Sequence, residues 1–418
     1  MRILVMAAGS HGDVAPYTGL GAHLRGEGHQ VALAAPETFR ELVAGSGLEF
    51  RPLPVDPRGA PTGPEGGRSE LLARAAAFID RLGDGLADAA APGADLLLLG
   101  TTTAPLGWHL AEAMDVPSLG VYLQPTLPTG EFPPVVGGSR SLGRWGNRAA
   151  GALGQRVVDR LHTGAARRLR SRLGLPAGSQ GARRRAVERA NWPVLHGFSP
   201  TLVPRPADWR DGLQVVGNWW PHVAADYRLP AEVEDFLRAG PPPVFIGFGS
   251  MAAGQGERLG ALAVDTLRRA GVRGVLQAGW AGIAEEDDDV LSVGEVPHAH
   301  LFPRMAAVVH HAGAGTAAAT LRAGVPSVPV PVMADQPFWA DRLVRAGTAA
   351  APIRFADLTA AGLAEAIRRA VEGRPLRTRA EAVARAMAEE NGAARVAEAV
   401  AAVGADRQAG VMGRGRGR

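Results

Sequence analysis

The chain has 418 residues, of which 46% are hydrophobic and 21% are charged, so it is long enough for two domains and too apolar to be disordered. It contains no cysteine, which excludes disulfide scaffolds, thiolate metal sites and cysteine nucleophiles. The formal net charge is +4, and three of these charges belong to the final Arg-Gly repeat, so the nearly neutral body gives no sign of nucleic-acid binding.

The first half alternates buried-strand patterns with helical patterns. The opening apolar run is too short for a signal peptide, and no stretch is long enough for a membrane helix, so we expect a cytoplasmic protein without stable membrane insertion. The expected strands are 3–8, 30–36, 95–100 and 117–122, with a short apolar segment at 48–53, and the expected helices are 16–27, 37–45, 70–90 and 105–114. Continuous apolar strands separated by helices are typical of a parallel sheet that is covered on both faces.

Residues 199–243 interrupt this pattern with proline and tryptophan, which indicates a domain boundary. The alternation then restarts, with expected strands at 243–249, 274–279, 290–295, 306–313 and 327–332, helices at 256–270, from 315 and from 336, and helical sequence over 360–403. We therefore predict an α/β protein with two doubly wound, Rossmann-like domains that face each other across a cleft.

Ligands of such sheets bind beyond the carboxyl ends of the strands, where three segments of this chain draw attention. These are GSHGDVAP at 9–16, GFGSM at 247–251, and VVHHAGAGTAAATLRAGVPSVPVPVMADQPFW at 308–339. None contains the dinucleotide fingerprint or the Walker motif. The third runs from a strand through glycines into a helix N-terminus, which is a favourable place for a phosphate.

Each segment has a structural and a functional interpretation. Asp13 suits a helix cap, yet Asp13 or His11 could also act as a general base in the cleft. Of the adjacent residues His310 and His311, alternation along a strand lets one line the cleft, and His311 is nearer the turn. With Gly313, Gly315 and Thr316, His311 could surround a diphosphate.

Asp335 and Gln336 suit either a helix cap or a ligand with several hydroxyls. His298 and His300 are the one close pair of candidate metal ligands, and we do not expect a metal site. An arginine-rich stretch indicates either a solvated helix face or weak contact with anionic lipid or an acidic partner; its members are Arg156, Arg160, Arg167, Arg168, Arg170, Arg172 and Arg183 to Arg185.

Residues 293–349 resemble the donor-binding signature of family 1 glycosyltransferases of the GT-B fold, especially actinobacterial antibiotic and macrolide glycosyltransferases and sterol glucosyltransferases. Their version reads roughly HHGGxGTxxxxLxAGxPxxxxPxxxDQxxW. GSHGDVAPYTGLGAHLRGEGHQVALAAP at 9–36, LQPTLPTGEFPPV at 123–135 and GFGSM are similar to further segments of that family. Together these similarities cover most of both halves in the right order.

The resemblance implies a nucleotide-diphosphate sugar as co-substrate, a lipophilic small-molecule acceptor, and inverting transfer of a hexose without a metal or cofactor. It places the diphosphate at His311, Gly313, Gly315 and Thr316, and the sugar hydroxyls at Asp335 and Gln336. Gly249 and Ser250 would lie on the donor side of the cleft, Trp280 and Val296 would border the base, and Asp13 would activate the acceptor.

The implied domains are an acceptor-binding domain at 1–205, a linker at 206–225 and a nucleotide-sugar-binding domain at 226–385. A C-terminal helix at 386–404 would cross back to the first domain, and 405–418 would form a disordered tail. The loops near 55–70 and 125–150 would shape the acceptor site.

Two departures from the family pattern leave questions open. His11 stands where bacterial relatives often have Arg, so His11 remains an alternative to Asp13 as the base. Ala319 stands where the plant signature has a ribose-binding Glu, so uridine and thymidine donors both remain possible. A sugar-nucleotide epimerase or hydrolase of the same fold, or a catalytically silent binding protein, are the alternative functions.

Overall fold

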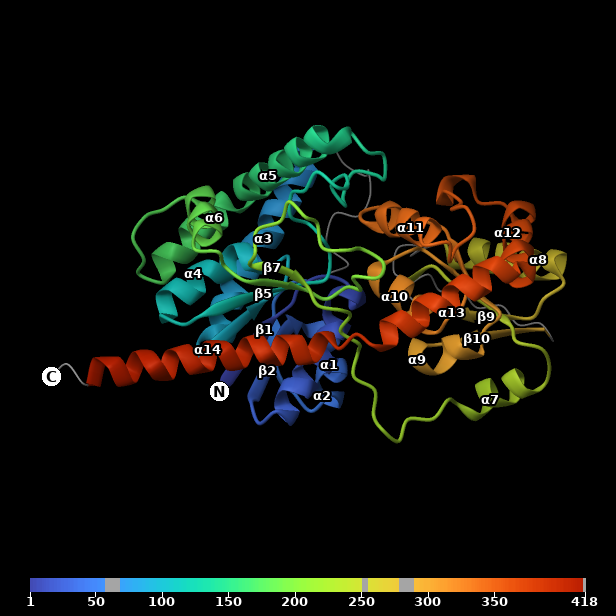
Figure 1. Cartoon of the computed structure of the whole chain (residues 1–418), viewed down its shortest axis with the longest axis horizontal. Helices are drawn as coiled ribbons and strands as arrows, with labels where there is room; N and C mark the ends of the chain where they lie inside the picture. The colour runs from blue at the N-terminus through green and yellow to red at the C-terminus, as the bar shows by residue number, and fades with distance from the viewer. Residues whose placement is uncertain (57–67, 250–254, 278–288, 416–418) are drawn as a thin grey trace.

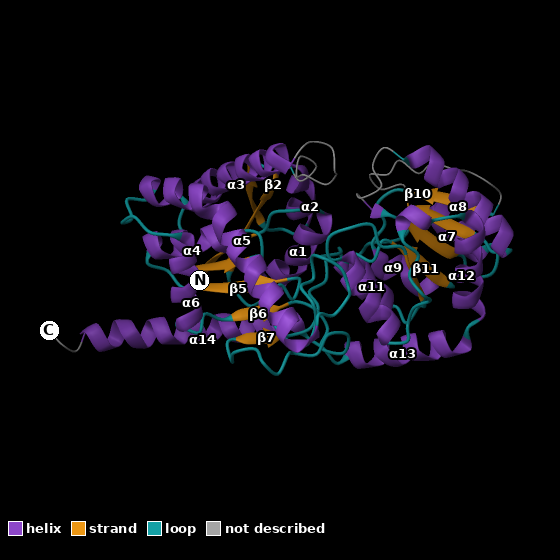
Figure 2. Cartoon of the chain, turned by 90° about the horizontal axis from the view of Figure 1, so that it is seen from above, coloured by secondary structure: helices purple, strands orange, loops and turns teal. Residues whose placement is uncertain are grey.

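The computed structural model contains two parallel sheets, each covered by helices (Figures 1 and 2). It describes residues 1–56, 68–249, 255–277 and 289–415. The first sheet has the order β3-β2-β1-β4-β5-β6-β7 and the second has the order β10-β9-β8-β11-β12, and every strand pair is parallel. The structure therefore confirms the prediction of two doubly wound domains.

The strands of the first sheet are β1 Arg2–Met6, β2 Gln30–Pro36, β3 Glu49–Leu53, β4 Leu96–Leu99, β5 Ser118–Tyr122, β6 Val194–His196 and β7 Leu213–Val215. Its helices are α1 His11–Gly26, α2 Arg40–Gly45, α3 Arg68–Ala90, α4 Ala104–Met114, α5 Gly143–Arg172 and α6 Gln180–Arg189, with a 3-10 turn η1 at Glu37–Phe39.

The second sheet contains β8 Val244–Gly247, β9 Gly274–Gln277, β10 Val290–Val293, β11 Ala307–His310 and β12 Ser327–Pro329. Its helices are α7 Ala231–Arg238, α8 Gly256–Ala270, α9 His298–Leu301, α10 Ala314–Arg322, α11 Gln336–Arg345, α12 Ala360–Glu372 and α13 Arg374–Ala388, with 3-10 turns η5 Phe302–Arg304 and η6 Phe355–Asp357. The final helix is α14 Gly392–Gly415.

Three boundaries differ from the sequence expectations. Helix α1 begins at His11 and not at Pro16, because Ser10 occupies the N-cap and the helix accommodates Pro16 in its interior. Strand β7 lies inside the expected linker at 206–225 and pairs with β6. The sequence did not predict this strand because it has three residues, which are too few to show an alternating pattern. Helix α14 continues to Gly415, past the expected end at residue 404, and the rest of the expected tail lies outside the described residues.

Both sheets place their functional loops at a switch in strand order. In the first sheet β1 lies between β2 and β4, and in the second β8 lies between β9 and β11. The connections from β1 and β4, and from β8 and β11, run to opposite faces of their sheets, which opens a crevice at the carboxyl ends of the strands. The three segments singled out from the sequence begin at these crevices.

An apolar cluster joins the two domains beneath the crevices. Phe132 in the first domain packs edge-to-face on Phe338 of α11, with ring centroids 5.3 Å apart. Phe198 packs in the same way on Trp339, at 5.9 Å. Helix α11 therefore anchors the second domain to loops that follow β5 and β6.

The chain crosses back to the first domain after α13 (Figure 1). The carboxylate of Glu390 accepts hydrogen bonds from Ser199 Oγ at 2.6 Å and Thr201 Oγ1 at 2.9 Å. Helix α14 then contacts α1 and buries Val396 and Val400 completely in the first domain's core. This confirms the expected crossing of the C-terminal helix. Within the described residues, no helix is both long and apolar enough to cross a membrane.

Truncation of both buried valines of α14, Val396→Ala with Val400→Ala, should destabilise the protein by about 3 to 4 kcal/mol, because four buried carbon groups are lost. Thermal and urea unfolding measure this effect. The control is Ala402→Ser, which lies on the exposed side of the same helix and should leave the unfolding midpoint unchanged. Equal midpoints for the double variant and the control would contradict the docking of α14.

Candidate functional site

The imidazole of His311 lies between the backbones of two glycines. A Cβ on Gly249 would come within 2.9 Å of His311 Cε1, and a Cβ on Gly313 would overlap Nε2. Gly249 also has a φ of +59°, which favours glycine. The structure thus brings together three predicted residues from the loops after β8 and β11.

The first turn of α10 lies beside this ring and presents its amides without intrahelical acceptors. Gly313 is the N-cap, and the amides of Ala314, Gly315 and Thr316 are the ones that no carbonyl of the helix can reach. A Cβ added to Gly315 would meet no atom within 4 Å, so the backbone there is open to a ligand. The partial positive charge of the helix end favours an anion at this position.

Burial lowers the pKa of His311 to about 4, so the imidazole is neutral at pH 7. Its Nδ1 is buried and has no hydrogen-bond partner within the described part of the chain. The site thus combines free amides with an imidazole that still lacks a partner, a donor set that suits a phosphate.

The neighbouring residues His310 and Ala312 shape the turn. His310 is fully buried, its Nδ1 accepts the amide of Ala312 at 3.1 Å, and burial lowers its pKa to about 3. Ala312 has a φ of +62° at the position where the related pattern has glycine. A left-handed conformation costs a non-glycine residue about 1 to 2 kcal/mol, so this turn is held by its surroundings.

The carboxylate of Asp13 is fixed at the start of α1. Ser10 donates to Oδ2 from its amide at 2.8 Å and from its hydroxyl at 2.9 Å, and Gln124 Nε2 donates to Oδ1 at 3.2 Å. Asp13 also lines a small pocket with Tyr17, Thr101 and Gln124. The side chain therefore stabilises the helix start, as the structural interpretation expects, and also lines the pocket at the crevice.

His11 lies at the same helix start. It is exposed and packs edge-to-face with Phe39 at 6.2 Å. Burial and, to a smaller extent, the charges of His11 and His311 lower the pKa of His298 to about 3. His298 therefore lies near a histidine of each domain, and its ring stacks on Phe302 at 4.2 Å.

Asp335 is the N-cap of α11 and lies across from Asp13. Burial raises the pKa of Asp335, the negative charge of Asp13 raises it further, and a hydrogen bond from Trp339 opposes both. Trp339 Nε1 donates to Asp335 Oδ2 at 2.9 Å. The two carboxylates thus approach each other from the two domains.

The amide oxygen of Gln336 accepts the backbone amides of Val332 at 2.7 Å and Met333 at 3.1 Å. These bonds hold the loop before α11 and leave the amide nitrogen of Gln336 as the group that can donate to a ligand. Asp335 and Gln336 therefore offer an acceptor and a donor side by side.

The remaining predicted residues are less informative. The side chain of Val296 is 7% exposed and packs in the core of the second domain. Ser250 and Trp280 lie outside the described residues. His300 packs edge-to-face with Tyr227 at 5.0 Å, and the described residues contain no group of three carboxylates or imidazoles able to hold a metal ion.

The sequence analysis assigned no role to Ser10, Gln124 or Trp339, which hold the two carboxylates. A signal existed for Gln124, because it follows the end of β5 by two residues and so lies at the carboxyl edge of the sheet. Trp339 lies one helical turn after Asp335, a spacing that places two side chains on one face.

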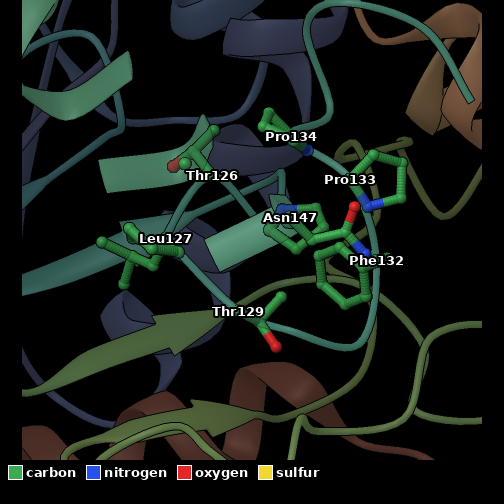
Figure 3. A pocket seen from close by; sticks show the side chains of 10 residues that line it. Thr126, Leu127, Thr129, Phe132, Pro133, Pro134 and Asn147 are labelled. Carbon is green, nitrogen blue, oxygen red and sulfur yellow. The ribbon is translucent and has the colours of Figure 1, made fainter. Parts of the chain in front are cut away.

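A second pocket lies beside the crevice in the first domain (Figure 3). It is lined mainly by the loop 125–134, with Asn147 and Gly151 of α5. Asn147 Nδ2 donates to the carbonyl of Gly130 at 3.2 Å, and the carboxylate of Asp208 accepts the Thr129 hydroxyl at 2.6 Å. These bonds fix the loop, whose proline, leucine and phenylalanine side chains give the pocket an apolar wall.

Comparisons with known proteins show the family and the fold of the chain. Residues 3–86 match the glycosyltransferase family 28 N-terminal domain, and residues 278–403 match the erythromycin biosynthesis protein CIII-like C-terminal domain. The chain is 38% identical to O-mycaminosyltylonolide 6-deoxyallosyltransferase of Streptomyces fradiae, over 94% of this chain and 95% of that protein. It is 33% identical to a sterol 3-beta-glucosyltransferase of Arabidopsis thaliana over 94% of its own length, but spans only 64% of that longer protein.

Solved structures show the same fold. The glycotransferase of kitacinnamycin superimposes with a TM-score of 0.71 at 20% identity, covering 96% of this chain and 98% of that one. A glycosyltransferase of Streptomyces sp. SF2575, complexed with thymidine diphosphate, gives a TM-score of 0.64 at 23% identity, covering 96% and 99%.

Replacement of the buried carboxylate, Asp335→Asn, should raise the thermal stability at pH 8. The folded-state pKa of Asp335 lies above its ordinary value of 3.8, so folding penalises the ionised form, whereas an amide oxygen can still accept from Trp339. The gain in thermal stability of the variant over wild type should be complete above the folded-state pKa of Asp335. It should disappear as the pH falls towards the ordinary pKa of 3.8.

The matched control is Asp341→Asn on the same helix, whose carboxylate pairs with Arg345 at 2.6 Å. Loss of this solvent-accessible pair should leave stability unchanged or slightly lower. A lower melting temperature for Asp335→Asn than for wild type at pH 8 would contradict the assignment.

Proposed function

The chain belongs to the glycosyltransferase family that contains the 6-deoxyallosyltransferase and the sterol glucosyltransferases. From this premise we propose that it transfers a hexose from a UDP- or dTDP-sugar to a hydroxyl of a lipophilic natural product. We propose that the transfer inverts the configuration of the anomeric carbon. The observation that carries the proposal is the opposition of two helix starts: α10 with His311 on one side of the crevice, and α1 with Asp13 on the other.

In the proposed donor site, the diphosphate binds at the start of α10. The amides of Gly315 and Thr316, the Thr316 hydroxyl and the His311 imidazole would donate to its oxygens. Negative charge develops on the diphosphate as its bond to the sugar breaks, and fixed donors at a helix N-terminus stabilise that charge without having to reorganise. These groups would neutralise the negative charge of the leaving diphosphate, which a bound metal ion does in metal-dependent enzymes. This supports metal-independent transfer.

The sugar would lie at the start of α11. One carboxylate oxygen of Asp335 is occupied by Trp339, and the other is available to accept from a sugar hydroxyl. The amide nitrogen of Gln336 would donate to a neighbouring hydroxyl, because its oxygen is already bound by the loop backbone. By the family resemblance, Gly249, Ser250 and Trp280 would complete the donor side, whereas Val296 is buried in the core of the second domain.

Asp13 is the proposed general base. Its carboxylate lines the pocket at the crevice, whereas the His11 ring packs against Phe39. Asp13 would take the proton of the acceptor hydroxyl as the oxygen attacks the anomeric carbon, while the electron pair of the breaking bond goes to the diphosphate. Because nucleophile and leaving group would lie on opposite sides of the sugar, the configuration inverts.

The acceptor would enter through the first domain. The loop 125–134 of that domain presents apolar side chains that would contact a macrolide, polyketide, glycopeptide or sterol-like molecule, although the pocket it lines in the structure, about 10 Å³, is too small to enclose one (Figure 3). The cytoplasmic location and the absence of nucleic-acid partners stay predictions.

Asp13→Asn should reduce transfer by about a hundredfold or more, since a positioned base contributes that much, while the affinity for the nucleotide should change little. The assay incubates UDP- and dTDP-sugars with a panel of macrolide and sterol acceptors, and measures the product by mass spectrometry and its anomeric configuration by NMR. The amide keeps the shape of the carboxylate but loses one acceptor oxygen at the start of α1, so the melting temperature and nucleotide affinity of the variant are measured beside its activity.

The matched control is His11→Asn at the same helix start, which should retain transfer. Unchanged turnover in Asp13→Asn would remove Asp13 as the base. Wild-type consumption of the sugar nucleotide at the same rate with and without any acceptor would instead indicate a hydrolase or epimerase.

A further inference from the structure

The N-terminal half of α5 and the residues before it expose large apolar side chains. Trp145 is 88% exposed, and Leu142 and Leu153 are each 61% exposed. Val136 and Val157 are 66% and 51% exposed. These five residues are called the apolar patch below.

Three residues of the patch lie on α5, and Val136 and Leu142 precede it. Leu153 and Val157 are four residues apart and share a side of α5, and Trp145 lies about two turns before Leu153 on the adjoining exposed surface. The opposite side, with Asn147, Gly151 and the buried alanines that follow, packs against the first domain. No neighbouring element among the described residues covers the patch, since its side chains are exposed.

Cationic side chains flank the patch. Arg140, Arg156 and Arg160 are all exposed, and none forms an ion pair within the described part of the chain. Apolar and cationic groups are therefore interleaved along the same exposed surface.

The C-terminal half of α5 differs. Arg168 pairs with Asp80, Arg170 with Glu112, and Arg172 with Asp84 and Asp88. Arg184 of α6 pairs with Asp159 and Glu188. Part of the arginine-rich stretch that the sequence analysis considered for lipid contact therefore holds helices together, and Arg156 and Arg160, beside the apolar patch, are among its members without an ion pair in the described part of the chain.

We propose that the apolar patch and its flanking arginines form a surface that binds an anionic lipid membrane. An exposed Trp with neighbouring aliphatic groups suits the membrane–water interface, and unpaired arginines complement anionic headgroups. A second copy of this chain is a poorer occupant, because a twofold contact would bring the same unpaired arginines together. The surface lies in the plane of the interface and does not require a spanning helix.

The surface and the pocket of Figure 3 lie on opposite sides of one helix, because Asn147 and Gly151 line the pocket whereas Trp145 and Leu153 are exposed. If the proposed function holds, a lipophilic acceptor dissolved in the membrane would reach the apolar loop 125–134 by passing one helix. The membrane contact itself does not depend on that function.

The test is co-sedimentation of the full chain with two kinds of vesicle, pure phosphatidylcholine and phosphatidylcholine mixed with anionic phosphatidylglycerol. Wild type should bind the anionic vesicles, and high salt should weaken the binding. Trp145→Ser with Leu153→Ser, and separately Arg156→Glu with Arg160→Glu, should each reduce binding by about tenfold.

Matched controls lie on other surfaces. Val344→Ser removes an apolar group of α11 that is 37% exposed, and Arg374→Glu with Arg385→Glu reverses two exposed charges of α13. These variants should bind like wild type. Nucleotide binding of the α5 variants should stay unchanged, which shows that they fold and separates this test from that of the proposed function.

Three outcomes would overturn the proposal: no binding of wild type to anionic vesicles, equal losses in control and α5 variants, or equal binding to both kinds of vesicle. Sedimentation velocity without lipid gives a further check. A dimer of wild type that Trp145→Ser with Leu153→Ser dissociates would assign the patch to self-association instead.

Discussion

The ring of His311 fits between Gly249 and Gly313, and the proposed donor side of the crevice is built around this close approach. A side chain at either glycine would collide with the imidazole, so the loop after β8 and the turn after β11 must both be bare backbone here. The same turn starts α10 with free amides and holds Ala312 in a left-handed conformation. Packing of one ring thus fixes the two loops, the direction of the helix and the donors that face the ligand.

The second domain is held to the first in a way that keeps two carboxylates opposed. Phe132 packs against Phe338 and Phe198 packs against Trp339, both on α11, and the indole of Trp339 also donates to the Asp335 carboxylate. Trp339 therefore takes part in the contact between the domains and also binds the carboxylate that is proposed to bind the sugar. Burial and the charge of Asp13 raise the pKa of Asp335, so ionisation of this carboxyl costs stability in the folded state, as is common at functional sites.

The sequence predicted the parts of this account that depend on local pattern. Apolar runs and glycine-rich turns identified the two sheets and the loops that carry Asp13, His311 and Asp335, because strand periodicity and helix-start chemistry are local properties. Contacts between distant segments could not be predicted: Gln124 reaches Asp13 across the sheet, and Arg172 reaches Asp84 and Asp88 on α3. The strands β6 and β7 were missed because three residues show no period. The roles of the individual site residues remain proposals.

The measurement that tests the donor site most directly is calorimetric titration of wild type and His311→Ala with UDP and dTDP. Loss of a buried hydrogen bond to a charged ligand is worth about 1.5 to 3 kcal/mol, so the variant should bind the preferred nucleotide at least about tenfold more weakly. The control, His300→Ala, removes an exposed histidine of the same domain and should bind like wild type. Identical titration curves for wild type and His311→Ala would contradict a diphosphate site at the start of α10.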